Sequence, residues 1–250
     1  MAYPKQFSFN HLNQVVLSVV LLLVFTASCS SLKEETASST TIPEIQEADT
    51  LRYLALGDSY TIGHSVAFQD RFPMQLADSL RANNFRMLTP QIIAVTGWTT
   101  TRLLEELAIN PPAKDFDLVS LLIGVNNQYR NFDFEVYEEE FPNLLNKAIQ
   151  YAGGDKNNVF VVSIPDYAFT PFGQSANNPQ KISEELDAYN AYAKTLCEQE
   201  GIPFFNITPI SREGLERAEL VASDGLHPSG KMYQEWIQLF YQEVELLLQN

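Results

Sequence analysis

A serine, a histidine and an aspartate in this sequence carry the residue types of nucleophilic catalysis. Ser59 follows Gly57-Asp58 at the end of a short apolar run. A serine hydroxyl is a weak nucleophile until a base takes its proton, and histidine is the commonest base. His227 lies three residues after Asp224. A turn between them would bring the carboxylate to the imidazole Nδ1 and leave Nε2 to accept the serine proton.

Simpler structural roles also explain these residues. Gly, Asp and Ser all favour turns, so the stretch 57–59 alone is compatible with an ordinary turn. Asp224-Gly225 is a turn sequence too, and a helix beginning after it would leave His227 exposed to solvent. His64, five residues after Ser59, is expected at the surface or at the rim of a site rather than as the base.

Two other short segments offer donors for a developing oxyanion. Gly97 follows one apolar run, and Gly124 with Asn126 follows another. A glycine lets a backbone N–H approach a ligand closely, and an asparagine amide donates hydrogen bonds without adding charge. If the strands are parallel, both segments lie at the same sheet edge as Ser59.

Alternating strands and helices must position these residues. Apolar runs predict strands at about 52–56, 91–95, 117–123, 159–164 and 203–207. Helical periodicity predicts helices that include 74–80 and span about 99–107, 135–151, 179–200 and 230–248. This alternation is typical of an α/β protein with a parallel sheet of about five strands and helices on both faces, as in flavodoxin-like sheets.

The four segments together resemble the SGNH (GDSL) hydrolase family. The resemblance covers Gly57-Asp58-Ser59, Gly97, Gly124-x-Asn126 and Asp224-x-x-His227, in this order across nearly the whole domain. It implies a three-layer α/β/α flavodoxin-like sandwich that hydrolyses acyl or acetyl esters with no cofactor and no metal. It also implies Ser59 as nucleophile, His227 as base held by Asp224, and an oxyanion hole formed by Ser59, Gly97 and Asn126.

One residue departs from the family pattern. The third segment usually reads Gly-x-Asn-Asp, and Asn127 replaces the aspartate here. The asparagine of the oxyanion hole is kept, so we expect the hole itself to be intact. What the substitution leaves open is how this loop is braced.

The amino end predicts export and lipid attachment. Residues 15–25 form an apolar run of signal-peptide length, and small residues lead from it to Cys29. We expect a lipoprotein signal peptide at 1–28, a lipid on Cys29, a flexible tether at 29–49 and the hydrolase domain at 50–250. The protein would then be anchored by lipid in a bacterial cell envelope. Cleavage by an ordinary signal peptidase is the alternative.

Charge and missing motifs exclude several functions. The formal charge of −15 disfavours binding to nucleic acid or to an anionic membrane surface. No Gly-x-Gly-x-x-Gly or Walker sequence occurs, so a nucleotide cofactor is unsupported. The expected partner is a small-molecule, glycan or lipid ester. Tyr60 and Trp98 are expected to line its pocket, and the aromatic stretch 166–178 to lie over it.

Two alternative functions stay open. One is a metal-dependent phosphoesterase that uses Asp58, Asn126, Asp224 and His227 as ligands. The other is a catalytically inactive relative that binds glycans at the cell surface.

Overall fold

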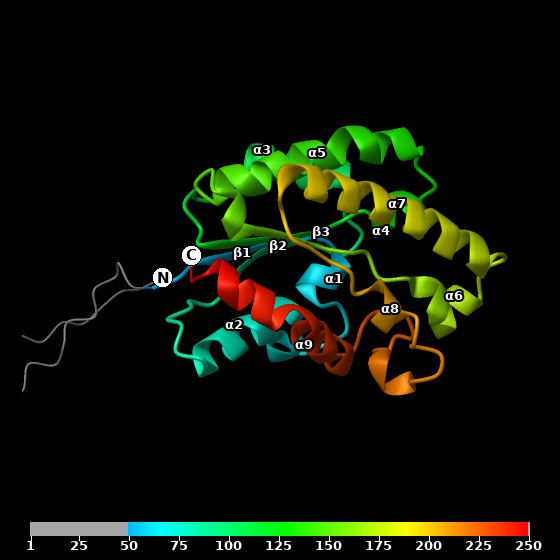
Figure 1. Cartoon of the computed structure of the whole chain (residues 1–250). Helices are drawn as coiled ribbons and strands as arrows, with labels where there is room; N and C mark the ends of the chain where they lie inside the picture. The colour runs from blue at the N-terminus through cyan, green and yellow to red at the C-terminus, as the bar shows by residue number, and fades with distance from the viewer. Residues whose placement is uncertain (1–49, 250) are drawn as a thin grey trace, which may run out of the picture. The chain divides into compact units, whose positions relative to one another are not determined.

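The strands form one parallel sheet at the centre of the fold (Figure 1). The structure is a computed structural model that describes residues 50–249. The strand order is β2-β1-β3-β4-β5. Every residue of β1 and β3 is buried, as expected for parallel strands covered on both faces. The strands are β1 (Tyr53–Gly57), β2 (Gln91–Ala94), β3 (Leu118–Leu122), β4 (Val159–Val162) and β5 (Phe204–Phe205).

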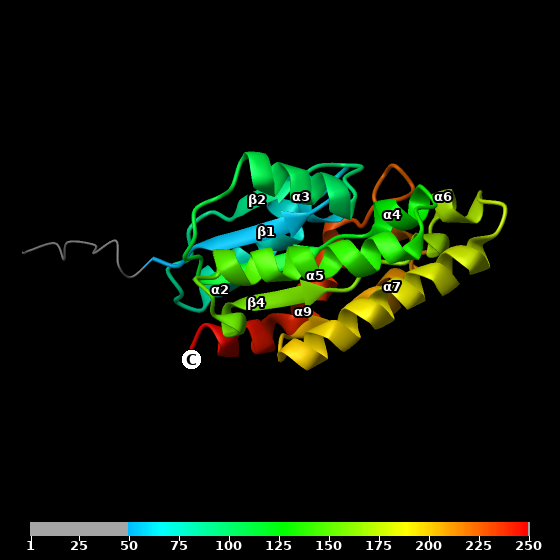
Figure 2. The ribbon, with the colours of Figure 1, turned by 90° about the horizontal axis from the view of Figure 1, so that it is seen from above.

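Two helical layers cover the sheet. One face carries α3 (Thr100–Ile109), α5 (Phe134–Tyr151) and α7 (Pro179–Glu200), the layer that faces the viewer in Figure 2. The opposite face carries α2 (Phe72–Ala82) and α9 (Gly230–Leu247), which pack against each other. This arrangement confirms the predicted three-layer α/β/α sandwich with a flavodoxin-like strand order.

The long helices begin and end at residues suited to those positions. In α7, the Asn178 side chain accepts a hydrogen bond from the Lys181 N–H, Pro179 occupies the first turn, and Gly201 ends the helix with φ 71°. Such a left-handed end is easiest for glycine. The predicted limits of 179–200 are therefore confirmed.

Helix α5 contains a proline, and the neighbouring helix compensates for it. Pro142 has no N–H, so the carbonyl of Glu138 lacks its usual partner within the helix. The hydroxyl of Tyr192, from α7, donates to that carbonyl at 2.8 Å. The bond links the two helices at the point where the helical ladder is interrupted.

Four of the five predicted strands are one to three residues longer than the observed ones, mainly because loop residues beside them are also apolar, and the first is shifted by one residue. Sequence periodicity did not reveal the short elements, which include few residues and lie mostly after strand ends. They are α1 (Ser59–Ile62), α4 (Val125–Tyr129), α6 (Pro171–Gln174) and α8 (Thr208–Ser211), with 3₁₀ turns η2 (Phe68–Asp70), η3 (Lys156–Asn158), η4 (Tyr167–Phe169) and η5 (Ala218–Leu220).

The predictions for the amino end lie outside the described residues. They are the signal peptide at 1–28, the lipid on Cys29 and the tether at 29–49, and they stay predictions. Within residues 50–249, the helices are all too short or too polar to cross a membrane. Cys197 is fully buried.

Candidate active site

A cavity of about 450 Å³ opens at the carboxyl ends of the strands. Four residues singled out in the sequence line it: Ser59, Gly97, Asn126 and His227. They follow β1, β2 and β3 or precede α9. Parallel pairing of β1 with both β2 and β3 brings the first three together, because it aligns the ends of these strands. Tyr60 also lines the cavity and packs edge-on against the His227 ring at 5.7 Å.

Ser59 is the first residue of the short helix α1, which begins directly after β1. The Asp58 carboxylate caps this helix by accepting the Tyr60 N–H at 3.0 Å. Gly57 allows the end of β1 to pack closely against β3, since a Cβ there would lie 2.3 Å from the Leu122 carbonyl oxygen. Among the described residues there is no hydrogen bond between Ser59 and His227. Catalytic bonds of this kind are often long without substrate.

The turn before α9 holds an aspartate against the histidine. Asp224 Oδ2 lies 2.7 Å from His227 Nδ1, and Ser65 Oγ donates to the same oxygen at 2.6 Å. Asp224 Oδ1 accepts the backbone N–H groups of Leu226 and His227 at 2.9 and 3.0 Å. Gly225, with φ 72°, makes the turn that folds the carboxylate back.

These contacts set the charges of the pair. Partial burial acts to raise the pKa of Asp224, but hydrogen bonds from Ser65, two backbone N–H groups and His227 hold that pKa well below its ordinary 3.8. Burial lowers the pKa of His227 below its ordinary 6.5 despite the stabilising carboxylate. His64 lowers it further. The pair is therefore a carboxylate beside a neutral imidazole near neutral pH.

His64 lies closer to the site than a surface position would suggest. Its ring centre is 4.6 Å from that of His227, and its Nδ1 lies 2.9 Å from Thr96 Oγ1. It is solvent-exposed and stands at the rim, between the turn that carries Asp224 and the loop that carries Gly97.

Side chains of α4 and of its capping residue hold the loop after β2 by hydrogen bonds. Asn126 Nδ2 donates to the Trp98 carbonyl at 3.0 Å, and Arg130 Nη2 donates to the Gly97 carbonyl at 3.1 Å. Gly97 has φ 87°, a conformation that favours glycine. Two carbonyls of this loop are thereby fixed, which restricts the orientation of the peptide units between them.

Asn127 braces the same loop through a hydrogen-bond chain. Its Oδ1 accepts the Thr100 N–H at 3.0 Å, and its Nδ2 donates to Thr100 Oγ1 at 2.6 Å. The Thr100 hydroxyl donates onward to Glu140 Oε2 at 2.5 Å. Because a hydroxyl has one proton, Thr100 can serve only one acceptor. Residue 127 must therefore donate to the Thr100 hydroxyl, as an amide can, because the carboxylate at position 140 takes the hydroxyl proton.

Aromatic side chains form one part of the cavity wall. Tyr129, Tyr167 and Phe172 line the cavity, with ring centres 6.2 to 6.4 Å apart. Trp98, which we expected in the pocket, is not among the lining residues and instead packs against the core. Phe169, from the predicted covering stretch, also packs against the core.

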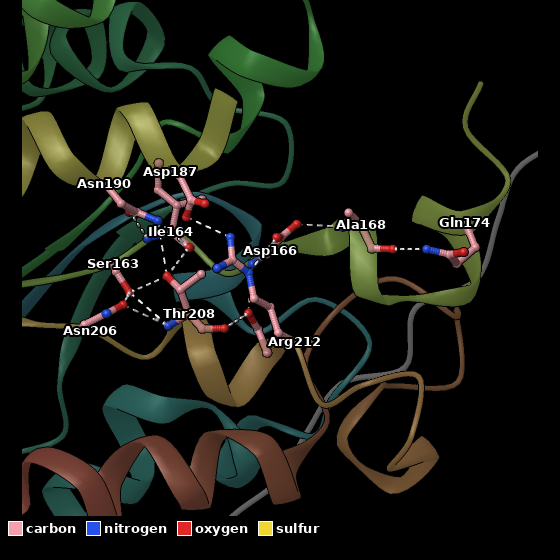
Figure 3. A network of polar contacts seen from close by, with 11 residues as sticks. Ser163, Ile164, Asp166, Ala168, Gln174, Asp187, Asn190, Asn206, Thr208 and Arg212 are labelled. Atoms are coloured by element: carbon pink, nitrogen blue, oxygen red, sulfur yellow. Dashed lines mark hydrogen bonds and ion pairs between the residues drawn. The ribbon is translucent and has the colours of Figure 1, made fainter. Parts of the chain in front are cut away.

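A polar network fixes the segment that carries two of these aromatics (Figure 3). Asp166 is fully buried, caps η4 through the Ala168 N–H at 3.0 Å and accepts Arg212 Nε at 2.9 Å. Arg212 also donates to Asp187 on α7 at 2.7 Å. Gln174 Nε2 donates to the Ala168 carbonyl at 2.8 Å, which closes the segment on itself.

The start of this segment, directly after β4, is held by an amide and two hydroxyls, also drawn in Figure 3. Asn190 Oδ1 accepts the Ile164 N–H at 2.7 Å, while its Nδ2 donates to the Ile164 carbonyl at 3.0 Å. Thr208 Oγ1 and Ser163 Oγ lie 2.9 Å apart. The network ties the end of β4 to α7 and α8, so the aromatic wall has a rigid support.

The arrangement fits a hydrogen-bonded aspartate–histidine pair better than a metal centre. His64, Asp224 and His227 place one ligand atom each within 4.8 Å of one another. However, each Asp224 oxygen already accepts two hydrogen bonds. The ligand set of the phosphoesterase hypothesis is not assembled, because Asp58 is fully buried and is not among the residues that line the cavity.

Sequence reasoning missed Ser65, Thr96, Tyr129 and Arg130. Tyr129 and Arg130 lie three and four residues after Asn126, so a helical turn would place all three on one face. However, the helix is only five residues long, which is too short for a periodic signal in the sequence. Nothing local in the sequence marks Ser65 or Thr96, whose contacts join distant segments.

Asn127→Asp tests the hydrogen-bond chain of the oxyanion loop. The new carboxylate would face a hydroxyl whose proton already goes to Glu140, so we expect a loss of about 1–3 kcal/mol in the free energy of unfolding and a lower kcat. Combining it with Glu140→Gln reverses the chain, since the new amide can donate to Thr100, and should recover both quantities.

Urea unfolding and ester hydrolysis measure this series. Asn157→Asp, the same change on an exposed asparagine, is the control and should alter neither quantity appreciably. Equal defects in the Asn127→Asp variant and the double variant would show that the direction of the chain is wrongly assigned.

Asp58→Asn tests the buried carboxyl beside the serine. Burial raises the pKa of Asp58 to about 7, although the Tyr60 N–H lowers it in part. Between its ordinary 3.8 and that value, the folded state keeps a proton that the unfolded state releases. The free energy of unfolding must therefore fall as pH rises through this window, by on the order of 4 kcal/mol at most.

An amide does not titrate, so the Asp58→Asn variant should lose this slope and gain stability relative to the parent above about pH 7. Urea unfolding at about pH 5 and 9 measures the difference. The same difference at both pH values would contradict a buried neutral carboxyl.

Comparisons with known proteins agree with this architecture. The GDSL-like Lipase/Acylhydrolase family matches residues 55–235. A curated relative, the secreted effector protein SseJ of Salmonella typhimurium, is 33% identical over 86 residues. That match covers 33% of this chain and 20% of SseJ, so the chain spans about a fifth of its relative's length.

Solved structures share the fold at low identity. A member of the lipolytic G-D-S-L family from Veillonella parvula has a TM-score of 0.58 and 14% identity, covering 77% of this chain and 97% of that one. TesA has a TM-score of 0.57 and 16% identity, and the match covers 78% of this chain and 99% of TesA. A variant of Axe2, an acetyl-xylooligosaccharide esterase from Geobacillus, has a TM-score of 0.59 and 20% identity. That match covers 78% of this chain and 94% of the Axe2 chain. With the family match across residues 55–235, the chain belongs to the GDSL-like lipase/acylhydrolase family.

Proposed function

We propose that this enzyme cleaves carboxylic esters with Ser59 as nucleophile, His227 as general base and Asp224 as the group that orients and stabilises His227. The oxyanion would be bound by the N–H groups of Ser59 and Gly97 and by the Asn126 amide. The observation that carries the proposal is the 2.7 Å contact between Asp224 and His227 at a cavity that Ser59, Gly97 and Asn126 also line.

The chemistry proceeds in two halves. Ser59 Oγ attacks the ester carbonyl while His227 Nε2 takes its proton, and the developing oxyanion accepts the three donors. The ester C–O bond then breaks, and the leaving alcohol takes the proton from His227. Water attacks the acyl-enzyme, loses a proton to His227, and releases the acid and the free serine.

The local electrostatics support these roles. A general base must be neutral at working pH, and burial keeps the pKa of His227 low. The fixed carboxylate of Asp224 selects the tautomer with a proton on Nδ1 and stabilises the imidazolium that forms during reaction. Fixed carbonyls on the Gly97 loop reduce the reorganisation that oxyanion binding would need.

Ser59→Ala tests the nucleophile. We expect it to lower hydrolysis of 4-nitrophenyl acetate, butyrate and octanoate by at least about 10³-fold while leaving the free energy of unfolding within about 1 kcal/mol of the parent. Rates with and without EDTA should agree. Undiminished hydrolysis in the variant, or activity lost to EDTA, would point to the metal-dependent alternative. A folded parent protein without any turnover would favour the glycan-binding alternative.

The pH dependence of kcat/KM tests the base. Because His227 must be neutral, activity should fall at acid pH with an apparent pKa below the ordinary histidine value of 6.5. His64→Gln should move this acid limb to higher pH, since His64 lowers the pKa of His227 and glutamine cannot carry a charge. Gln can still hydrogen-bond Thr96. An acid limb that stays in place would show that His64 does not act on the base.

A further inference from the structure

One cation stands in an otherwise apolar and neutral part of the cavity. The face of α4 that lines the cavity carries Asn126, Tyr129 and the capping residue Arg130, at positions i, i+3 and i+4. Tyr167 and Phe172 continue this wall. An ester with only apolar groups would use the aromatic rings and leave the guanidinium without a function in binding.

Arg130 differs from most other arginines of the protein. At least five arginines of the described part lie within 4.0 Å of a carboxylate, among them Arg52, Arg81, Arg102, Arg212 and Arg217. Within residues 50–249, Arg130 forms no such ion pair, although the chain has 31 acidic and 16 basic residues. The one hydrogen bond that its side chain makes there is to the Gly97 carbonyl.

That hydrogen bond determines where the charge is held. A guanidinium has five N–H donors, and the bond to Gly97 uses one of them. The contact keeps the head group beside the loop expected to bind the oxyanion, one helical turn from Asn126. The remaining donors are free to bind a planar oxyanion such as a carboxylate, or a phosphate or sulfate.

We propose that Arg130 is a specificity residue and that the substrates of this enzyme are esters carrying an anionic oxygen group a few bonds from the scissile carbonyl. This inference rests on the proposed hydrolase function. The electrostatic field of the whole protein opposes the binding of such substrates, because a net charge of −15 would by itself repel an anion. A preference for anionic esters therefore requires a local cation, and Arg130 supplies one.

Two matched pairs of esters test the proposal and locate the anion. Mono-4-nitrophenyl adipate against 4-nitrophenyl hexanoate places the charge on the acyl side. 4-Acetoxybenzoate against 4-acetoxybenzamide places it on the alcohol side. We expect kcat/KM to favour the anionic member of at least one pair by about fivefold, as for a partly solvated charged hydrogen bond. The pair that shows the preference identifies the side.

Arg130→Gln removes the charge but keeps a donor for the Gly97 carbonyl. The ratio of anionic to neutral kcat/KM should fall to one or below in this variant and persist in Arg130→Lys. Using the ratio cancels any effect on Gly97 that both substrates share. The ratio measured in the parent protein tests the charge even if a variant does not fold.

The outcomes separate this inference from the proposed function. A parent ratio at or below one in both pairs, with turnover that Ser59→Ala abolishes, would overturn the role of Arg130 and leave the hydrolase intact. A ratio unchanged in Arg130→Gln would also overturn it. Absence of Ser59-dependent turnover with all four esters would overturn the proposed function and this inference with it.

Discussion

The parallel pairing of β1 with β3 is the constraint on which the rest of the site depends. Both strands are fully buried, so their register cannot slip without moving apolar side chains out of the core. The register pairs Gly57 with Leu122, and the segments that follow must leave the sheet side by side. Ser59 and Asn126 therefore face one cavity, at the position where the order of the strands reverses direction.

Charge at this edge is controlled by hydrogen bonds rather than by ion pairs. Asp224 keeps its negative charge beside a half-enclosed cavity because four donors surround its two oxygens. Asp58, only one residue before the serine, has a single backbone donor and full burial, and its pKa rises instead. Two aspartates near one serine thus have opposite protonation tendencies, set by their burial and by their numbers of hydrogen-bond donors.

The sequence was sufficient for features that depend on local pattern. Buried parallel strands are continuous apolar runs, which is why the sheet and its layers could be predicted. The turn at Asp224-Gly225 could be predicted because four consecutive residues contain both the carboxylate and the imidazole. Contacts such as Ser65 with Asp224, or His64 with Thr96, join segments far apart in the chain, and no local pattern encodes them.

The remaining gaps concern side-chain orientation. Trp98 and Gly97 are adjacent in sequence, yet Gly97 lines the cavity while the Trp98 ring packs against the core. The positive φ of Gly97 changes the direction of the chain there, and an expectation based on adjacency fails. Arg130 escaped notice for a related reason, because the helix that orients it is shorter than two turns.

The hydrogen-bond chain from Asn127 through Thr100 to Glu140 also constrains how this enzyme can evolve. A mutation to aspartate at position 127 is unfavourable while a carboxylate stays at position 140, because both would require the same proton. The reverse order is permitted, since a glutamine at 140 can accept or donate. A lineage that acquires the family's aspartate at position 127 therefore loses less stability if position 140 on α5 changes first.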